Sequence, residues 1–591
     1  MSRTRNAGRT RRLARSLAVV TGLALAAAAC SSGAEESGDD GGTGTGEPQS
    51  GGEITVLLDA GFAGGWATGL DPATSNTTGA NLPQNSAIFG GLFTLEPTDD
   101  GGAEIVPNQA ESYEWSDDGL TLTVTIREGI EFSDGTEMDA EAVVWNWIRE
   151  FSSGSSGAPT IQLNMDMEPP DLSESFMQSL WDALPEDVDR EIVTQRLGAI
   201  RAVDDRTVEM HLGEVNGSLV NGFPATNLNL IASPSAYEEM GAEQFRNAPV
   251  GAGPFVVEGN RQNERLELAR NENYFKDGLP YLDALNFQSV GGDQVAYQTV
   301  MAGQGDVIEG LSSVNLIEEA QNNPDLEVHL GAPTSPYVVQ LNARKPPFDD
   351  KRAREAIYYA TDFAAINEGL FNGEGEMSQS FTASGGLFHM PEVEGYREYD
   401  LEQAQQIVDE LGGLSVQLNT TDTGVARQVT TALQTQWQEA GMDVQIEAQA
   451  LNDVITTFTE GDWKSILQTA GAWDPSVGIG VGIRFGSTSP YSGTPLPEGA
   501  DNAQQALQEG LSTELDDILA DAVATTDEEE RAAAYREAAE YIAEEAYGPF
   551  GPAFQPAQVM RPGIHGPGLD VPIPALAVNQ GVLYDRVWME Q

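Results

Sequence analysis

Alternating hydrophobic and polar positions predict β-strands at several places in this chain. Three runs are clearest: Ile54, Val56 and Leu58; Leu120, Leu122, Val124 and Ile126; and Val208, Met210 and Leu212. Successive side chains of a strand point to opposite faces, so each run would present one apolar face to a core.

A spacing of three and four residues predicts amphipathic helices elsewhere. The expected stripes are Val144, Trp147, Ile148 and Phe151; Ala353, Ala356, Ile357 and Ala360; and Ala404, Ile407, Val408 and Leu411. Near the C-terminus, Thr526 and Glu529 fit a capping box. It would begin a helix with the stripe Tyr535, Ala538, Ile542 and Ala546.

One stretch predicts a complete βαβ unit. Residues 414–418 read as a strand, 425–440 as a helix and 442–448 as the returning strand, with Gly441 as a left-handed helix cap. The two strands should be parallel, joined by a right-handed crossover. Strands that alternate with helices in this way indicate an α/β fold.

Two stretches give weaker signals. Residues 152–200 contain a Gly-Ser run, a Pro-Pro pair and a helical pattern after Pro185, and we expect an insertion there. Gly478, Gly480 and Gly482 alternate, but they lack the spacing of a dinucleotide-binding loop. We expect an ordinary loop at these glycines.

The N-terminal residues predict export. Six arginines precede a short apolar run that stops at Cys30, the pattern of a secretory signal over residues 1–29. The position of Cys30 resembles a bacterial lipobox, so we expect a lipid on its thiol; a cysteine discarded with the signal is the alternative. Residues 30–51 are rich in glycine, serine and acid and predict a disordered tether. The sequence leaves the general and twin-arginine export routes open.

Membrane attachment would use this lipid alone, because no segment approaches the ~20 apolar residues of a membrane span. The formal net charge is −62, and without the six arginines of the signal it is −68. Such a charge excludes nucleic acid and anionic membrane surfaces as partners. Cys30 is the single cysteine, which excludes disulfides and thiolate zinc sites.

No set of residues in the sequence forms a catalytic constellation. The four histidines, His211, His329, His389 and His565, are scattered, and none has a second histidine three or four residues away. We expect His211 to be structural. The nucleophile elbow, the P-loop and the HExxH motif are all missing. We therefore expect no enzyme activity, no cofactor and no metal.

Five blocks resemble, in order, the family 5 solute-binding proteins that serve ABC importers of oligopeptides, dipeptides and related solutes. The first block is LDPATS (70–75) with FGGLFTL (89–95), and the second is the segment 115–147, which runs from a Trp through a strand pattern to the start of a helix pattern. The third is the segment 251–275, which begins with GAGPF. The last two are LNARKPPFDDKRAREAIYYATD (341–362) and the closing helices at 514–554.

The resemblance implies an α/β, bilobal clamp like that of periplasmic binding proteins, with three lobes. Lobe I would comprise residues 52–92, 200–335 and 550–591, lobe II residues 93–199, and lobe III residues 336–549. The ligand would lie between lobes I and III and be buried by hinge closure.

The resemblance also implies site residues. In peptide-binding relatives a Trp followed closely by an Asp lies on one wall of the cleft, and the Asp holds the α-ammonium group of the ligand. Trp473 and Asp474 match this pair, although relatives place spacer residues between the two, and a plain Asp-Pro turn is the alternative. The opposite wall, after Leu70-Asp71-Pro72, would supply Thr74, Ser75 and Asn76.

These observations predict a monomeric, extracytoplasmic lipoprotein anchored to the outer face of the cell membrane. It would capture di- or oligopeptides and deliver them to an ABC permease driven by cytoplasmic ATPases. One alternative is the same fold binding another solute, such as a nickel chelate, an oligosaccharide or an opine. Others are an extracytoplasmic hydrolase and a surface sensor or adhesin.

Overall fold

The computed structural model describes residues 47–60, 65–66, 68–74, 81–97, 103–153, 161–422, 424–470, 477–525, 527–553, 555, 557–572 and 581–591. The chain divides into two units, Met1–Glu47 and Pro48–Gln591. Of the first unit only Glu47 is described, so the fold below is that of the second. No helix of the described residues is long and apolar enough to cross a membrane.

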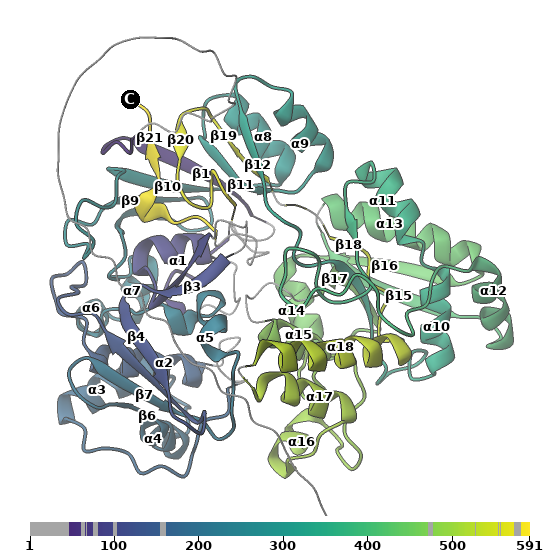
Figure 1. Cartoon of the computed structure of the whole chain (residues 1–591), viewed down its shortest axis with the longest axis horizontal. Helices are drawn as coiled ribbons and strands as arrows, with labels where there is room; N and C mark the ends of the chain where they lie inside the picture. The colour runs from purple at the N-terminus through teal and green to yellow at the C-terminus, as the bar shows by residue number, and fades with distance from the viewer. Residues whose placement is uncertain are drawn as a thin grey trace, which may run out of the picture. The chain divides into compact units, whose positions relative to one another are not determined.

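A seven-stranded mixed sheet has the order β12-β19-β11-β1-β10-β9-β8 (Figure 1). Its strands are β1 (Glu53–Asp59), β8 (Phe255–Arg261), β9 (Arg265–Arg270), β10 (Ala284–Val290), β11 (Val307–Leu311), β12 (Glu327–Leu330) and β19 (Ala557–Met560). The strand predicted from Ile54, Val56 and Leu58 is the central β1, parallel to both β10 and β11. Leu57, on its other face, is buried as well.

The predicted strands at Leu120 and Val208 are confirmed in a four-stranded antiparallel sheet of order β4-β5-β7-β6. Its strands are β4 (Ala110–Trp115), β5 (Thr121–Ile126), β6 (Ile200–Ala202) and β7 (Thr207–His211). Helix α2 (Ala140–Ser153) packs against β6 and β7. All four residues of its predicted stripe are buried, from Val144 to Phe151.

Besides the end of α2, the interval 152–200 contains two helices in its described part. The helix predicted after Pro185 is α4 (Arg190–Ala199). Helix α3 (Glu174–Ala183) was not predicted; Ser173 caps it by accepting a hydrogen bond from the Phe176 amide at 3.0 Å.

The predicted βαβ unit is confirmed in a second four-stranded sheet, of order β13-β17-β15-β16. Its strands are β13 (Tyr337–Leu341), β15 (Ser415–Thr421), β16 (Asp443–Gln449) and β17 (Ser465–Thr469). Helix α13 (Gly424–Glu439) joins β15 to its parallel neighbour β16, and Gly441 has a φ of +90°. Val429, Leu433 and Trp437 of this helix are buried.

The prediction of a loop at the three alternate glycines is wrong. Gly478, Gly480 and Gly482 lie in helix α15 (Gly478–Phe485), which buries Val481 and Phe485. A Cβ atom at Gly478 would come within 2.9 Å of the Tyr535 hydroxyl. Close packing, rather than turn formation, therefore explains glycine at this position.

The closing helix is confirmed, but its start differs in detail. Helix α18 (Glu528–Glu544) is capped by Asp527, whose carboxylate accepts hydrogen bonds from the amides of Glu529 and Glu530, each at 3.0 Å. Tyr535, Ala538 and Ile542 of the predicted stripe are buried within the helix. Ala546 follows the end of the helix at a φ of +56°. Thr526 lies outside the described residues.

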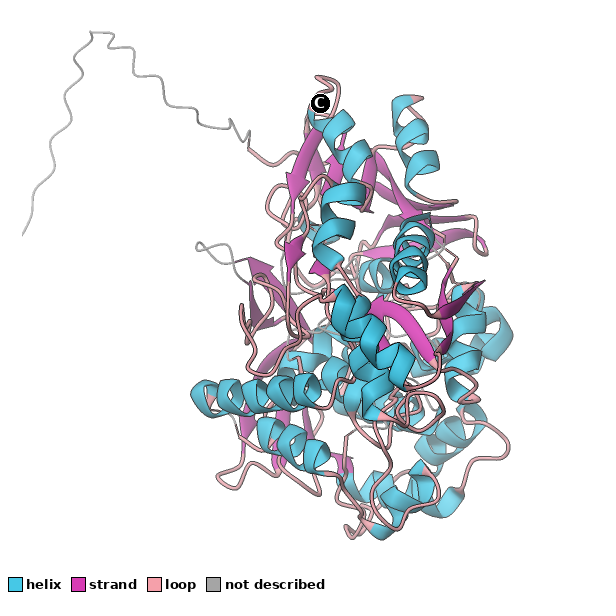
Figure 2. Ribbon diagram, turned by 90° about the vertical axis from the view of Figure 1, so that its right-hand side faces the viewer, coloured by secondary structure: helices cyan, strands magenta, loops and turns pink. Residues whose placement is uncertain are grey.

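Some of the remaining helices pack against strands and others against helices (Figure 2). They are α1 (Leu82–Phe89), α5 (Leu219–Gly222), α6 (Pro234–Met240), α7 (Ala242–Asn247), α8 (Asp293–Met301), α9 (Val314–Gln321), α10 (Lys351–Ala360), α11 (Phe363–Phe371), α12 (Leu401–Glu410), α14 (Leu451–Thr459), α16 (Ala503–Glu509) and α17 (Glu514–Val523), with the short 3-10 helices η1 (Pro72–Thr74), η3 (Phe223–Ala225), η4 (Asn227–Asn229) and η5 (Tyr584–Arg586). The two-stranded pairs are β2 (Phe93–Pro97) with β3 (Ala103–Pro107), β14 (Glu376–Met377) with β18 (Pro552–Ala553), and β20 (Ile564–His565) with β21 (Trp588–Met589).

The described residues form two bodies with separate hydrophobic cores. The first body comprises residues 53–330 and 557–591, and the second comprises residues 337–553. Val314 of α9 is the one described residue of the first body that joins a core cluster of the second. The chain passes between the bodies twice, after β12 and after β18.

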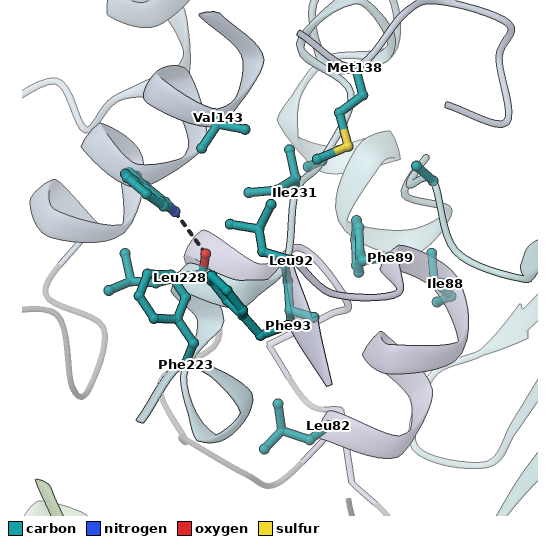
Figure 3. Packing of buried hydrophobic residues seen from close by; sticks show 14 of the residues in the cluster. Leu82, Ile88, Phe89, Leu92, Phe93, Met138, Val143, Phe223, Leu228 and Ile231 are labelled. Carbon is teal, nitrogen blue, oxygen red and sulfur yellow. Dashed lines mark hydrogen bonds between the residues drawn. The ribbon is translucent and has the colours of Figure 1, made fainter. Parts of the chain in front are cut away.

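The largest core lies in the first body. Figure 3 shows Phe93, Phe223 and Leu228 packed together there. The rings of Phe93 and Phe223 meet edge to face with centroids 5.2 Å apart. The buried Trp147 indole of α2 donates a hydrogen bond of 2.8 Å to the Leu228 backbone oxygen, so the antiparallel sheet and the segment of α5, η3 and η4 share this core.

Candidate ligand-binding cleft

The first wall of the expected cleft follows β1, and Thr74 is the one predicted residue of this wall that is described. It ends η1, where its amide and its hydroxyl both donate hydrogen bonds to the Asp71 backbone oxygen, at 3.0 and 3.1 Å. This short turn fixes the chain just before the next predicted residues. Ser75 and Asn76 lie outside the described residues.

A buried ion pair anchors this wall. The Arg149 guanidinium of α2 donates hydrogen bonds of 2.7 and 3.3 Å to the two carboxylate oxygens of Asp71, and the side chains are 3% and 1% exposed. Arg149 also lies over the rings of Trp145 and Tyr237, 4.4 and 4.5 Å from their centroids. Burial tends to lower the pKa of Arg149, but the charge and hydrogen bonds of Asp71 outweigh burial and raise it.

The sequence patterns did not predict this pair. Arg149 stands in a stretch of α2 whose residues are buried on every side. An arginine within a helix that is apolar all round signals a buried carboxylate partner, because an unpaired buried charge is very costly. That signal was present, but nothing in the sequence alone pointed to Asp71.

The second wall belongs to the second body, where β17 ends at Thr469 and α15 begins at Gly478. Trp473 and Asp474, predicted for this wall, fall between these two elements and lie outside the described residues. The flanking elements are tied together by Gln340, whose amide donates hydrogen bonds to the backbone oxygens of Arg484 (2.6 Å) and Tyr491 (3.1 Å).

Arg484 is a cation on this wall. Its Nε donates a hydrogen bond to the Thr469 backbone oxygen at 3.3 Å, which links α15 to the end of β17. Desolvation lowers the pKa of Arg484 to about 10, although the nearby Tyr491 acts in the opposite direction. The guanidinium therefore stays charged at neutral pH.

The carboxyl ends of the parallel strands β15, β16 and β17 carry further polar side chains. Asn419 is 1% exposed; its amide nitrogen donates to the Gln449 side-chain oxygen at 3.4 Å, whereas its own oxygen has no partner among the described residues. The Gln468 amide of β17 donates a hydrogen bond to the Gln340 side-chain oxygen. In open α/β sheets, ligands bind beyond this edge of the strands.

His211 is held between Glu209, 2.9 Å from its Nε2, and the Thr121 hydroxyl, 3.1 Å from its Nδ1, which supports a structural role. Within the described ranges, no group of three or more His, Cys, Asp or Glu residues could hold a metal ion.

The described residues therefore form two α/β bodies that are joined by two chain crossings. The chain belongs to the bacterial extracellular solute-binding proteins, family 5, because the model of the middle region of that family matches residues 104–491. The resemblance inferred from the five sequence blocks is thereby confirmed.

Individual relatives agree with this membership. The chain is 25% identical over 406 residues to the glutathione-binding protein GsiB of Escherichia coli O1:K1, covering 67% of this chain and 69% of the relative. The fold matches the binding protein DppA of Helicobacter pylori in complex with the peptide STSA, at a TM-score of 0.70 and 18% identity over 92% of this chain and 99% of that one. It also matches AgaA of A. tumefaciens R10 in complex with agropinic acid, at a TM-score of 0.70 and 18% identity over 91% and 99% of the two chains. These solved structures confirm the expected α/β binding-protein fold.

Proposed function

We propose that this chain captures di- or oligopeptides outside the cytoplasm and delivers them to an ABC-type permease. The observation that carries this proposal is the family match over residues 104–491. Main-chain hydrogen bonds to an extended ligand would allow one cleft to accept many peptide side chains. Thr74, Ser75 and Asn76 on one body, with Trp473 and Asp474 on the other, are the proposed contacts.

The protein would be held at the outer face of the membrane by a lipid on Cys30, with residues 30–51 as a tether and residues 1–29 as the signal. It would act as a monomer, and the permease and its ATPases would supply the transport. The lobe boundaries inferred from the family resemblance belong to this proposal as well.

A non-peptide ligand is the second candidate, and the fold match to the agropinic acid complex favours it. The two candidate ligand classes differ in that only peptides have an amide backbone. Peptides offer repeated amide groups and a free α-ammonium, and glutathione, which the relative GsiB is named for, shares these features.

Calorimetric titration of the Cys30→Ser protein, purified without its co-purifying ligands, would decide between them. The ligands are tri-alanine, glutathione and agropinic acid, and each is also incubated with the protein to detect turnover. We expect the tripeptide to bind and to be recovered intact. Binding of agropinic acid alone would overturn the peptide assignment, and cleavage of the peptide would overturn a transport role.

A further inference from the structure

The two bodies meet at a buried polar contact away from the two chain crossings. The Gly217 amide donates a hydrogen bond of 2.7 Å to the Val523 backbone oxygen. Beside it, the Arg531 guanidinium donates one of 2.8 Å to the Ser218 hydroxyl. In Figure 1, α5, which follows Ser218, and α17, which ends at Val523, both lie below β12 and β18.

Each side of the contact is anchored in its own body. Leu219 and Val220, directly after Ser218, belong to the core of the first body, while Tyr535, one turn after Arg531, belongs to a core of the second. Ser218 is 2% exposed and Arg531 is 3% exposed. The bodies therefore exclude water here through hydrogen bonds, and not through a shared hydrophobic core.

The second body holds the Arg531 donor in position. The Arg531 guanidinium lies over the Phe388 ring, 5.0 Å from its centroid, and Phe388 stacks on Tyr535 at 4.9 Å. A Cβ atom at Gly478 would lie 3.1 Å from the Ser218 hydroxyl. The absence of a side chain at Gly478 thus lets the first body approach closely enough for the hydrogen bond from Arg531 to Ser218 to form.

From this geometry we propose that Gly217 and Ser218, with Val523 and Arg531, form a latch that holds the two bodies together and sets how tightly any ligand is retained. The proposal rests on the proposed function, since it assumes a ligand between the bodies. If the bodies separate about the two crossings, Ser218 and Arg531 return to water. The latch therefore stabilises only the closed arrangement.

This latch contains no ligand atom, so it should act on every ligand alike. A ligand that binds the closed arrangement has an apparent affinity proportional to the closed fraction. Weakening the latch lowers that fraction by one factor, whatever the chemistry of the ligand. This uniform effect distinguishes the latch from a residue that recognises part of the ligand.

Ser218→Ala removes the acceptor of the charged hydrogen bond. We expect a larger radius of gyration than wild type in X-ray scattering without ligand, and a Kd for tri-alanine about tenfold to a hundredfold higher. Ser233→Ala is the matched control, because Ser233 is buried and donates to the charged Asp134 carboxylate at 2.7 Å within the first body. That control should lower the melting temperature without changing the radius of gyration or the Kd.

A second variant traps the latch. Gly217→Cys with Val523→Cys, in a Cys30→Ser background, places two thiols on residues whose backbones are hydrogen bonded, a separation that a disulfide can span. We expect the cross-link to form without ligand. It should slow the release of pre-bound tri-alanine at least tenfold, and reduction should restore the rate.

Scattering and cross-link formation are both measured without ligand, so they test the latch independently of the proposed function. Failure of wild type to bind tri-alanine would count against the peptide assignment and leave these two arms standing. The latch is overturned if Ser218→Ala scatters like wild type, or if the cross-linked protein exchanges tri-alanine at the wild-type rate.

Discussion

Glu309 is a carboxylic acid buried in β11 of the seven-stranded sheet. It is 3% exposed and accepts a hydrogen bond from the Tyr584 hydroxyl, and its other oxygen has no partner among the described residues. Burial raises the pKa of Glu309 to about 8, although the hydrogen bond from Tyr584 acts in the opposite direction. At neutral pH the folded protein therefore keeps this group protonated.

The Glu309 proton makes stability depend on pH. The pKa is higher in the folded chain than in the unfolded one, so unfolding releases a proton between about pH 4.5 and 8, and the free energy of unfolding falls as pH rises through this window. Glu309→Gln removes the titration and keeps an acceptor for Tyr584. We expect it to match wild type near pH 4.5 and to be more stable by about 3 kcal/mol at pH 7.

Urea unfolding at pH 4.5, 7 and 9 measures this difference. The exposed Glu258→Gln in β8 is the control and should show no such trend. A Glu309→Gln difference that stays constant over the three pH values would show that Glu309 is ionised in the folded protein.

Asp474 carries the residue-level support for a peptide ligand. If its carboxylate holds the α-ammonium group in the closed cleft, Asp474→Ala should weaken tripeptide binding about tenfold to a thousandfold, since truncating one partner of a buried charge pair costs about 2–5 kcal/mol. N-acetylation of the peptide should cause a similar loss in wild type. The two losses should not add, because each removes the same pair.

Titration of both proteins with both peptides tests this non-additivity. If Asp474→Ala binds the free tripeptide as tightly as wild type, Asp474 is only a turn residue. The unusual direct Trp473-Asp474 sequence would then have no role in peptide recognition.

At the scale of elements, one ionic contact joins α2 to the segment of Asp71. Arg149→Met leaves the Asp71 carboxylate buried without its cation, so we expect a loss of about 3–5 kcal/mol in the free energy of unfolding. Arg149→Met with Asp71→Asn removes both charges and should recover most of that loss. Denaturant unfolding of the three proteins measures both effects.

A loss below about 1 kcal/mol for Arg149→Met would mean that water reaches Asp71. Binding gives a second readout, because Asp71 also supports the turn at Thr74 through its backbone oxygen. Asp71→Asn keeps that oxygen, so the double variant should bind tri-alanine about as tightly as wild type.

Local elements were predictable where one pattern dominated. The βαβ unit from β15 to β16 was recognised because Val429, Leu433 and Trp437 fall on one stripe between two strand patterns. Helix α15 was missed, since glycine at 478, 480 and 482 is unfavourable in a helix unless packing requires it. Contacts between distant segments, such as Asp71 with Arg149 or β19 with β11, leave no periodic signal. The predicted site residues Ser75, Asn76, Trp473 and Asp474 lie outside the described residues, so their places in the cleft stay predictions.

At the scale of the whole molecule, lipidation of Cys30 decides where the protein works. Cys30→Ser should release the protein from the membrane fraction into the soluble extracytoplasmic fraction, because the expected tether offers no other attachment. Cell fractionation and immunoblotting measure this, with Ser31→Ala as a control that leaves the thiol in place. A Cys30→Ser protein that stays in the membrane fraction would contradict the lipoprotein assignment.

The position of β19 between β11 and β12 has a consequence for the order in which the protein is made. Residues 557–560 form an interior strand of the first body, and β11 and β12 pair with β19 and not with each other. While the chain is being synthesised and β19 has not yet been made, β11 and β12 both have open edges that can pair with other chains. The second body has all four strands of its own sheet within residues 337–469 and can fold as a unit. The first body begins earlier in the sequence, but its sheet can be completed only after almost the entire chain has been synthesised.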